Sequence, residues 1–257
     1  MGSVQTQELV IFSDNSVVSK ELSSGEGHNL ITITSSPSNS PFWLINALVE
    51  SKITGGASSQ HVQRGTPSDL PVTIGSFIHN GRQFTDVLKK AKIDANSYRV
   101  IDLLTDFVVK NIGKPRSKVL SELLDAFTEV PSSMIVLEQP EILLTLLEGL
   151  TSDELHRKFI LPLMAKCGIL LISTNVCYSL DGDNRDSVQL ARFASGCLYK
   201  SLAVLSLRPL ETGRAKDVTG SLRITRGGAS STHISCHVVE NEYLYLCQRD
   251  NTKLFYR

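Results

Sequence analysis

The sequence predicts an α/β fold in which a mostly parallel sheet is flanked by helices and extended by antiparallel C-terminal strands. The first observation is that short apolar segments alternate with amphipathic helical segments up to about residue 199. Several of these segments are apolar at nearly every position, as expected of strands that helices cover on both faces. The second observation is that residues 199–257 read as short strands joined by tight polar connections, which favours antiparallel pairing. We predict a single domain over residues 1–257.

Apolar runs define the predicted strands of the parallel part. They cover residues 30–34, 72–78, 98–103, 134–137 and 169–173. In the C-terminal part, strand-like patterns occur in the segments 199–207, 220–227, 232–239, 243–248 and 253–257. We expect a polar N-terminal segment over 1–27 and, from its Gly, Ser and Pro content, a long surface loop over 54–71.

Three helices carry recognisable start signals. The first predicted strand leads through a Ser/Pro/Asn turn into a helix that opens at Ser40–Pro41. A second helix has Pro115 in its opening turn. A third begins with Thr151 and Glu154, the spacing of a capping box in which each side chain satisfies the other's backbone N–H. Strands alternating with helices in this way predict βαβ units.

The balance of charges excludes a strong electrostatic field of one sign over the whole protein. Lys and Arg together number 26, as do Asp and Glu, so the net charge is zero and nucleic-acid binding would need local basic patches. No apolar run approaches the roughly 20 residues of a membrane span. The five cysteines form no CxxC pair, so we expect reduced, mostly buried thiols. Gly2 fits a loose myristoylation pattern, which leaves a membrane-associated adaptor as an alternative.

The turn in "ITITSSPSNSPFWLINALVE", residues 31–50, stands where a phosphate-binding loop normally lies in α/β proteins. This turn holds no glycine and no lysine, and its two prolines remove N–H donors that a phosphate would need. "SSMIVLEQPE" ends an apolar strand in Glu138, as strands that hold magnesium through water do. An ATPase with an irregular phosphate loop therefore stays open as an alternative. No G-x-S-x-G motif is present, so a nucleophile elbow is excluded.

The C-terminal extension carries many of the basic residues of the second half of the chain. Arg214 and Lys216 lie in the glycine-flanked turn "TGRAKDVTG". Arg223 and Arg226 follow in "SLRITRGG", on opposite faces of the predicted strand. Because Arg226 precedes two glycines, we expect it to leave the strand into a flexible loop, from which an arginine can reach an anion on a neighbouring subunit.

Four segments carry a family resemblance. They are "LKKAKIDANSYRVIDLLTDFVVKNI", "SSMIVLEQPEILLTLLEGLTSDEL", "GRAKDVTGSLRITRGG" and "HVVENEYLYLCQRDNTKLFYR". With them the whole chain resembles the fungal sixth subunit of the Elongator complex. The resemblance implies a RecA-like fold with a degenerate P-loop. It also implies a heterohexameric ring with the fourth and fifth Elongator subunits as partners, alongside the remaining subunits. Such a ring binds tRNA, hydrolyses ATP and supports wobble-uridine modification, so we expect no enzymatic activity of this subunit alone.

The resemblance also assigns roles to particular positions. Residues 35–43 match the Walker A position and Glu138 the Walker B position, while His79 and Asn80 stand where a water-activating glutamate is usual. Arg226 matches an inter-subunit nucleotide contact, so ATP is expected only at ring interfaces, with no cofactor or metal bound by this subunit alone. The implied tRNA contacts are Lys114, Arg116, Lys118, Arg185, Arg214 and Lys216. The implied location is cytoplasm and nucleus.

Overall fold

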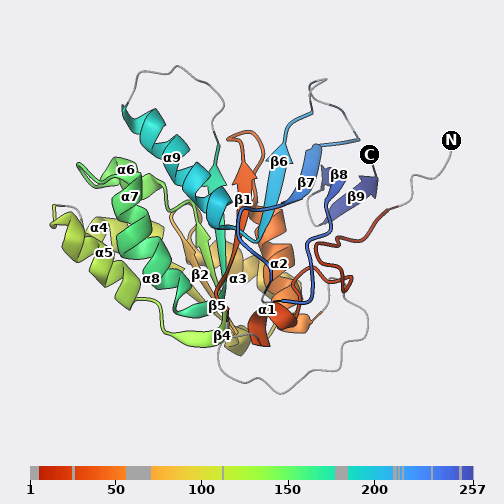
Figure 1. Ribbon diagram of the computed structural model, residues 1–257, viewed down its shortest axis with the longest axis horizontal. Helices are drawn as coiled ribbons and strands as arrows, with labels where there is room; N and C mark the ends of the chain where they lie inside the picture. Colours follow the sequence, from red (N-terminus) through yellow and green to blue (C-terminus); the bar gives the residue numbers. More distant parts are fainter. Residues whose placement is uncertain are drawn as a thin grey trace.

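The computed structural model describes residues 6–24, 27–55, 71–111, 113–176, 185–210, 213, 215, 217–232, 234–248 and 251–256. Within them the strands form one nine-stranded sheet in the order β3-β2-β4-β5-β1-β6-β7-β8-β9 (Figure 1). The predicted mixed architecture is confirmed, because β1 to β6 run parallel and β7 to β9 antiparallel. No helix among the described residues has the length and apolar character to cross a bilayer.

All five strands predicted for the parallel part form, and their bounds shift by a few residues. The observed strands are β1 Asn29–Ser35, β2 Val72–Ser76, β3 Tyr98–Asp102, β4 Val130–Glu138, β5 Cys167–Asn175, β6 Ala203–Arg208, β7 Gly220–Arg226, β8 Asn241–Cys247 and β9 Thr252–Tyr256. The largest difference is in β4, which begins at Val130 with an irregular register before Met134. Its polar opening residues hide the strand from a reading based on apolar runs.

The helices cover both faces of the sheet (Figure 1). Their bounds are α1 Glu21–Ser24, α2 Phe42–Thr54, α3 Gly81–Lys90, α4 Val108–Asn111, α5 Arg116–Asp125, α6 Ile142–Leu146, α7 Ser152–Leu155, α8 Leu161–Met164 and α9 Arg185–Lys200. A 3-10 turn, η1 Ala95–Ser97, and two π-helical turns, η2 Leu103–Phe107 and η3 His156–Ile160, complete the set. The π-helical turn η3 joins α7 to α8 without a gap. The helix predicted from the Thr151 signal is therefore present, but its hydrogen-bond pattern changes from α to π between these two segments.

Two hydrophobic clusters lie on opposite faces of the sheet. Alternate residues of β5 point to different clusters, so Ile169 and Leu171 face α2 and α3 whereas Leu170 and Ile172 face α5 to α9. All four side chains are fully buried, with no exposed surface. The long buried strands explain why the apolar runs were readable in sequence.

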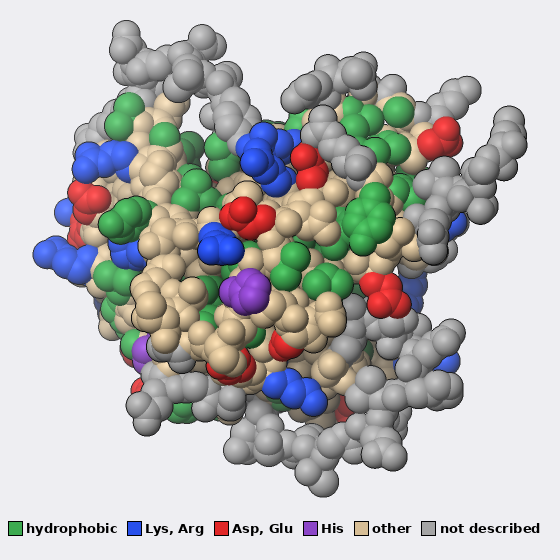
Figure 2. Space-filling model, turned by 45° about the vertical axis from the view of Figure 1, so that its right-hand side comes forward, with side chains coloured by type: hydrophobic (Ala, Val, Ile, Leu, Met, Phe, Trp, Pro, Cys, Tyr) green, Lys and Arg blue, Asp and Glu red, His purple; other side chains and the backbone are tan. Residues whose placement is uncertain are grey.

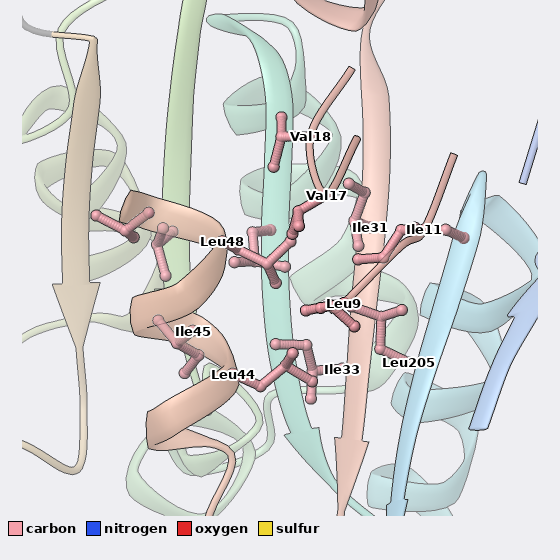
Figure 3. Close-up of a cluster of buried hydrophobic side chains, with 14 of the residues drawn as sticks. Leu9, Ile11, Val17, Val18, Ile31, Ile33, Leu44, Ile45, Leu48 and Leu205 are labelled. Atoms are coloured by element: carbon pink, nitrogen blue, oxygen red, sulfur yellow. The ribbon is translucent and has the colours of Figure 1, made fainter. Parts of the chain in front are cut away.

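The N-terminal segment is part of the core. Figure 3 shows Leu9, Ile11, Val17 and Val18 packed with β1, β6 and α2 side chains. The prediction of a polar segment over 1–27 overlooks these residues, which lie in two short apolar runs, 9–12 and 17–18, within an otherwise mostly polar stretch. Within the predicted loop 54–71, Thr54 ends α2 and residues 56–70 lie outside the described residues.

Two further expectations need correction. The segment 232–239 forms no strand in its described part; it makes one bridge, between Val238 and Phe12, and the Glu21 carboxylate accepts backbone N–H groups from Ser235 and Cys236. At the third helix the Thr151 hydroxyl accepts the Glu154 N–H at 3.2 Å, as expected, but the Glu154 carboxylate binds Arg116 and Lys158. The sequence pattern thus specified one half of the cap.

Candidate functional site: a degenerate nucleotide corner

The turn between β1 and α2 binds its own polar groups. The Asn39 N–H donates to the Ser36 carbonyl at 2.9 Å, and the Phe42 N–H donates to the Ser40 hydroxyl at 3.3 Å. Pro41 occupies the N-cap position and offers neither an N–H nor a side-chain cap. A phosphate-binding loop needs convergent free N–H groups. In this turn, two N–H groups are instead used internally and the two prolines supply none.

Aromatic side chains fill the space beside the turn. The Phe42 ring lies 4.6 Å from the His79 ring and 4.9 Å from the Phe84 ring, between centroids. Trp43, the next residue of α2, contacts Tyr245 of β8 with ring centroids 5.2 Å apart. The helix start is therefore packed against α3 on one side and the antiparallel strands on the other.

A hydrogen bond locks the turn to the antiparallel strands. The buried Asn39 side chain donates to the Tyr245 hydroxyl at 2.6 Å. Burial raises the pKa of Tyr245 to about 12, so this hydroxyl stays protonated. Gly220 lies so close that a Cβ there would meet the Asn39 amide at 2.6 Å. The space that a nucleotide's phosphates would enter is thus crossed by protein contacts.

A polar row crosses three parallel strands at their carboxyl ends. Ser76 of β2, Glu138 of β4 and Ser173 of β5 are aligned in register on the α2 and α3 face. Ligands of open α/β sheets bind at this edge. Glu138, the predicted Walker B residue, lies at the centre of the row with no exposed surface.

Glu138 is held by two partners on the neighbouring strand and its loop. The Ser76 hydroxyl donates to the carboxylate, and His79 Nδ1 lies 2.9 Å from each carboxylate oxygen. Asn80, predicted beside His79 in place of a water-activating glutamate, instead caps α3 in a complete capping box with Gln83. His79 and Asn80 therefore have structural roles: His79 binds Glu138, and Asn80 caps α3.

Sequence reasoning missed a second buried carboxylate. Glu141 follows β4 and accepts the Asn175 N–H at 2.7 Å on Oε1, whereas its Oε2 has no hydrogen-bond partner. Burial, together with the nearby Glu138 charge, raises the pKa of Glu141 to about 7, against the opposing effect of the Asn175 N–H. The only signal in the sequence is its spacing of three residues from Glu138, which does not reveal burial.

Asn175 connects this carboxylate to the corner. Its side chain donates to Gln139 at 2.9 Å and accepts from the Ser35 hydroxyl at 3.2 Å. Gln139 adopts a left-handed backbone with φ of 51°, uncommon for a residue other than glycine. One network thus joins the carboxyl ends of β1, β4 and β5.

Comparison with known proteins identifies the family. No protein-family model matches the chain. The chain is 44% identical over 275 aligned positions to Elongator complex protein 6 of Saccharomyces cerevisiae, and the alignment covers 100% of both chains. The chain belongs to the Elongator complex protein 6 family. Its role as part of an Elongator complex follows from that membership.

Among solved structures, this Elongator protein 6 homologue resembles the flagellar accessory protein FlaH from Methanocaldococcus jannaschii. The TM-score is 0.51 at 13% identity, with 93% of this chain and 94% of that chain covered. Identity this low informs about the fold alone. The fold is RecA-like, which confirms the expectation from the sequence resemblance.

In this Elongator protein 6 homologue, Arg226 and the corner lie at opposite ends of the parallel strands. Arg226 ends the antiparallel strand β7 and pairs with Ala203, the first residue of β6, at the amino end of the parallel strands. The corner and Glu138 lie at the carboxyl ends. Arg226 is exposed, and within its own chain it does not join the corner, so any nucleotide contact would have to be made in a neighbouring subunit.

The expectation of a flexible loop after Arg226 is wrong. Gly227 and Gly228 donate backbone N–H groups to Leu202 and Leu198. A Cβ on Gly227 would lie 1.9 Å from the Ser201 carbonyl oxygen. The two glycines are needed because the backbone docks on the end of α9, a contact that the sequence alone does not predict.

The basic residues expected to contact tRNA fall into two groups. Lys114 donates to Asn111 and Glu122, Arg116 pairs with Glu154, and Lys118 lies 4.0 Å from Glu122. Arg185 begins α9, but its side chain is outside what the structure describes, as are Arg214 and Lys216. Figure 2 shows Lys and Arg interspersed with Asp and Glu on the displayed face.

Metal-binding and thiol chemistry find no support in the described part of the chain. It contains no group of three or more His, Cys, Asp and Glu side chains placed to hold a metal. Cys167, Cys197 and Cys236 are buried free thiols and Cys247 is exposed. Burial raises the pKa of Cys167 to about 12. Such thiols are inert, and the expectation of mostly buried cysteines is confirmed for these four.

Proposed function

We propose that this chain is a non-catalytic RecA-like subunit of a heterohexameric Elongator ring that binds tRNA and supports wobble-uridine modification. The fourth and fifth Elongator subunits are the proposed ring partners, and the cytoplasm and nucleus the proposed location. The observation that carries the proposal is the combination of full-length similarity to Elongator complex protein 6 with a corner whose phosphate space is packed.

The packed corner supports an accessory role in three ways. The Asn39 and Phe42 N–H groups of the turn are bound internally, and its two prolines have no N–H. Phe42 covers His79, and His79 in turn binds Glu138. A Walker B carboxylate must be open to a hydrated magnesium ion to function, whereas Glu138 has no exposed surface. Nucleotide in the proposed ring therefore belongs to interfaces at which other subunits supply the phosphate loop.

Binding of tRNA by the proposed ring is a property of several subunits. This chain has zero net charge, so affinity must sum over local basic patches around the ring. Such affinity falls steeply with salt because phosphate contacts release counterions.

Nucleotide binding by the purified chain tests the proposal. We expect isothermal titration with ATP and magnesium to give no binding tighter than millimolar. The Phe42→Leu variant keeps an apolar side chain at this position, and it is titrated in parallel as a control for the aromatic packing of the corner. Micromolar ATP affinity of the unmodified chain would instead support the alternative of an ATPase with an irregular phosphate loop.

A further inference from the structure

A pocket opens among α5, α6, α7 and η3, away from the corner. Its volume is about 800 Å³, enough for several side chains of a ligand. It is lined by Asn111, Gly113, Lys114, Pro115, Arg116, Ser117, Val119, Leu143, Leu146, Leu147, Glu148, Glu154 and Lys158. The pocket therefore combines leucines with cations.

The apolar part of the lining is incompletely covered. Val119 and Leu143 are buried beneath it, whereas Leu146 is 46% exposed. Large apolar side chains that gather at a hollow mark binding surfaces more often than scattered ones do.

The first charged wall begins at Lys114 and has two cations for one carboxylate, although Lys118 and Glu122 are not themselves lining residues. Glu122 lies 2.9 Å from the Lys114 ammonium and 4.0 Å from that of Lys118. Because both lysines share a single negative charge, this wall keeps an excess of positive charge after its internal pairing.

The second wall repeats this arrangement. Glu154 lies 3.2 Å from Arg116 and 2.7 Å from Lys158. Among the described lining residues, the cations Lys114, Arg116 and Lys158 outnumber the carboxylates Glu148 and Glu154. A ligand complementary to this pocket carries negative charge beside an apolar group.

We propose that the pocket docks a segment of another Elongator subunit in which a bulky apolar residue is flanked by Asp or Glu. The apolar residue enters against Leu143 and Leu146, and its carboxylates meet the shared cations. Nucleic acid fits less well. Among the lining residues that the structure describes none is aromatic, so these residues offer bases no stacking platform, and a phosphate backbone leaves the leucines exposed. The proposal rests on family membership and is independent of nucleotide or tRNA binding by the ring.

Site-specific photo-crosslinking in reconstituted Elongator tests the proposal. Benzoylphenylalanine is placed at position 146 in one sample and at position 188 in a control, since Val188 is similarly exposed on α9 but lies outside the pocket. We expect the probe at 146 to crosslink a subunit segment with Leu, Ile, Met or Phe within three residues of two acidic residues. Crosslinks to tRNA, to a second copy of this chain, or to nothing would overturn the proposal.

Affinity measurements complete the test once the crosslinked segment is known as a synthetic peptide. We expect Leu146→Asp to weaken binding of that peptide to the full chain at least tenfold, and Leu146→Met to leave it within about twofold. The melting temperature of each variant, measured alone, separates docking from folding. Equal affinity of the Leu146→Asp variant and the unmodified chain would contradict the assignment.

Discussion

His79 Nδ1 lies 2.9 Å from both oxygens of the fully buried Glu138 carboxylate. The two residues come from the ends of neighbouring parallel strands, where a RecA-like ATPase keeps its magnesium-binding and catalytic carboxylates. Here one is a histidine whose ring packs at a tilt against Phe42, and the other is a carboxylate closed off from solvent. The geometry of a nucleotide site is retained while its polar groups stabilise the fold.

Replacing Glu138 tests this structural role. Because Glu138→Gln removes a buried charge that Ser76 and His79 bind, we expect it to lower the free energy of unfolding by about 1–3 kcal/mol. Urea denaturation measures the loss. Glu129→Gln is the matched control, since Glu129 is exposed, and it should change stability by less than about 0.5 kcal/mol. Equal effects of the two changes would show that the Glu138 contacts contribute nothing.

The buried Glu141 predicts a pH dependence of stability. Its pKa is raised to about 7 in the folded chain, so between pH 4.5 and 7 the folded state holds a proton that the unfolded state has released. Stability from this group is therefore complete below about pH 4.5 and declines by up to about 3 kcal/mol as pH rises through 7.

Glu141→Gln isolates that contribution, since the amide oxygen still accepts the Asn175 N–H. Denaturation of both proteins at pH 5 and pH 8 measures it. We expect the variant to gain stability relative to the unmodified chain at pH 8 and little at pH 5. A constant difference between the two proteins would mean that Glu141 does not titrate in this range.

Replacing Gly227 tests whether the backbone that follows Arg226 is held tightly against the end of α9. A Cβ at this position meets the Ser201 carbonyl at 1.9 Å, so Gly227→Ala should cost about 3 kcal/mol through overpacking. Gly113→Ala is the control, because Gly113 has a φ of 81° but no atom within 4 Å of a Cβ. It should cost about 1 kcal/mol from backbone strain alone. Similar losses in thermal unfolding would point to a loop that relaxes freely.

Arg226 is expected to act on a neighbouring subunit. In the assembled ring, Arg226→Ala should lower ATP turnover roughly tenfold or more while the ring stays intact, as for an arginine supplied across an interface. Arg223→Ala, on the same strand and also exposed, should leave turnover unchanged. If turnover by the Arg226→Ala ring is normal, the arginine has no part in hydrolysis.

The cations Lys114 and Arg116 distinguish protein docking from tRNA contact. An RNA-contacting cation reduces the slope of log affinity against log salt by about 0.7–0.9 when it is removed. Since both residues line the docking pocket, we expect Lys114→Gln with Arg116→Gln to leave the tRNA affinity of the intact ring and its salt slope unchanged. A shallower slope would return these residues to the RNA path, as the sequence resemblance implied.

The sequence predicted the features that depend on residues close together in the chain and missed those that depend on distant partners. The apolar runs of β1, β2 and β5 and the position of Glu138 at a strand end were readable because neighbours in sequence determine them. The buried N-terminal side chains, the docked Gly227 and the raised pKa of Glu141 depend on partners far along the chain. The pairing of Arg116 with Glu154 likewise appears only when α5 packs beside α7. The structure tests none of the implied tRNA contacts, and those at Lys114, Arg116, Lys118, Arg185, Arg214 and Lys216 all stay predictions.

Native mass spectrometry of the chain mixed with the fourth and fifth Elongator subunits tests the central claim most directly. A closed heterohexamer containing two copies of each subunit is the predicted result. Removal of this chain should abolish the six-membered species. A stable ring of the other two subunits without it, or a chain that stays monomeric in the mixture, would contradict the account.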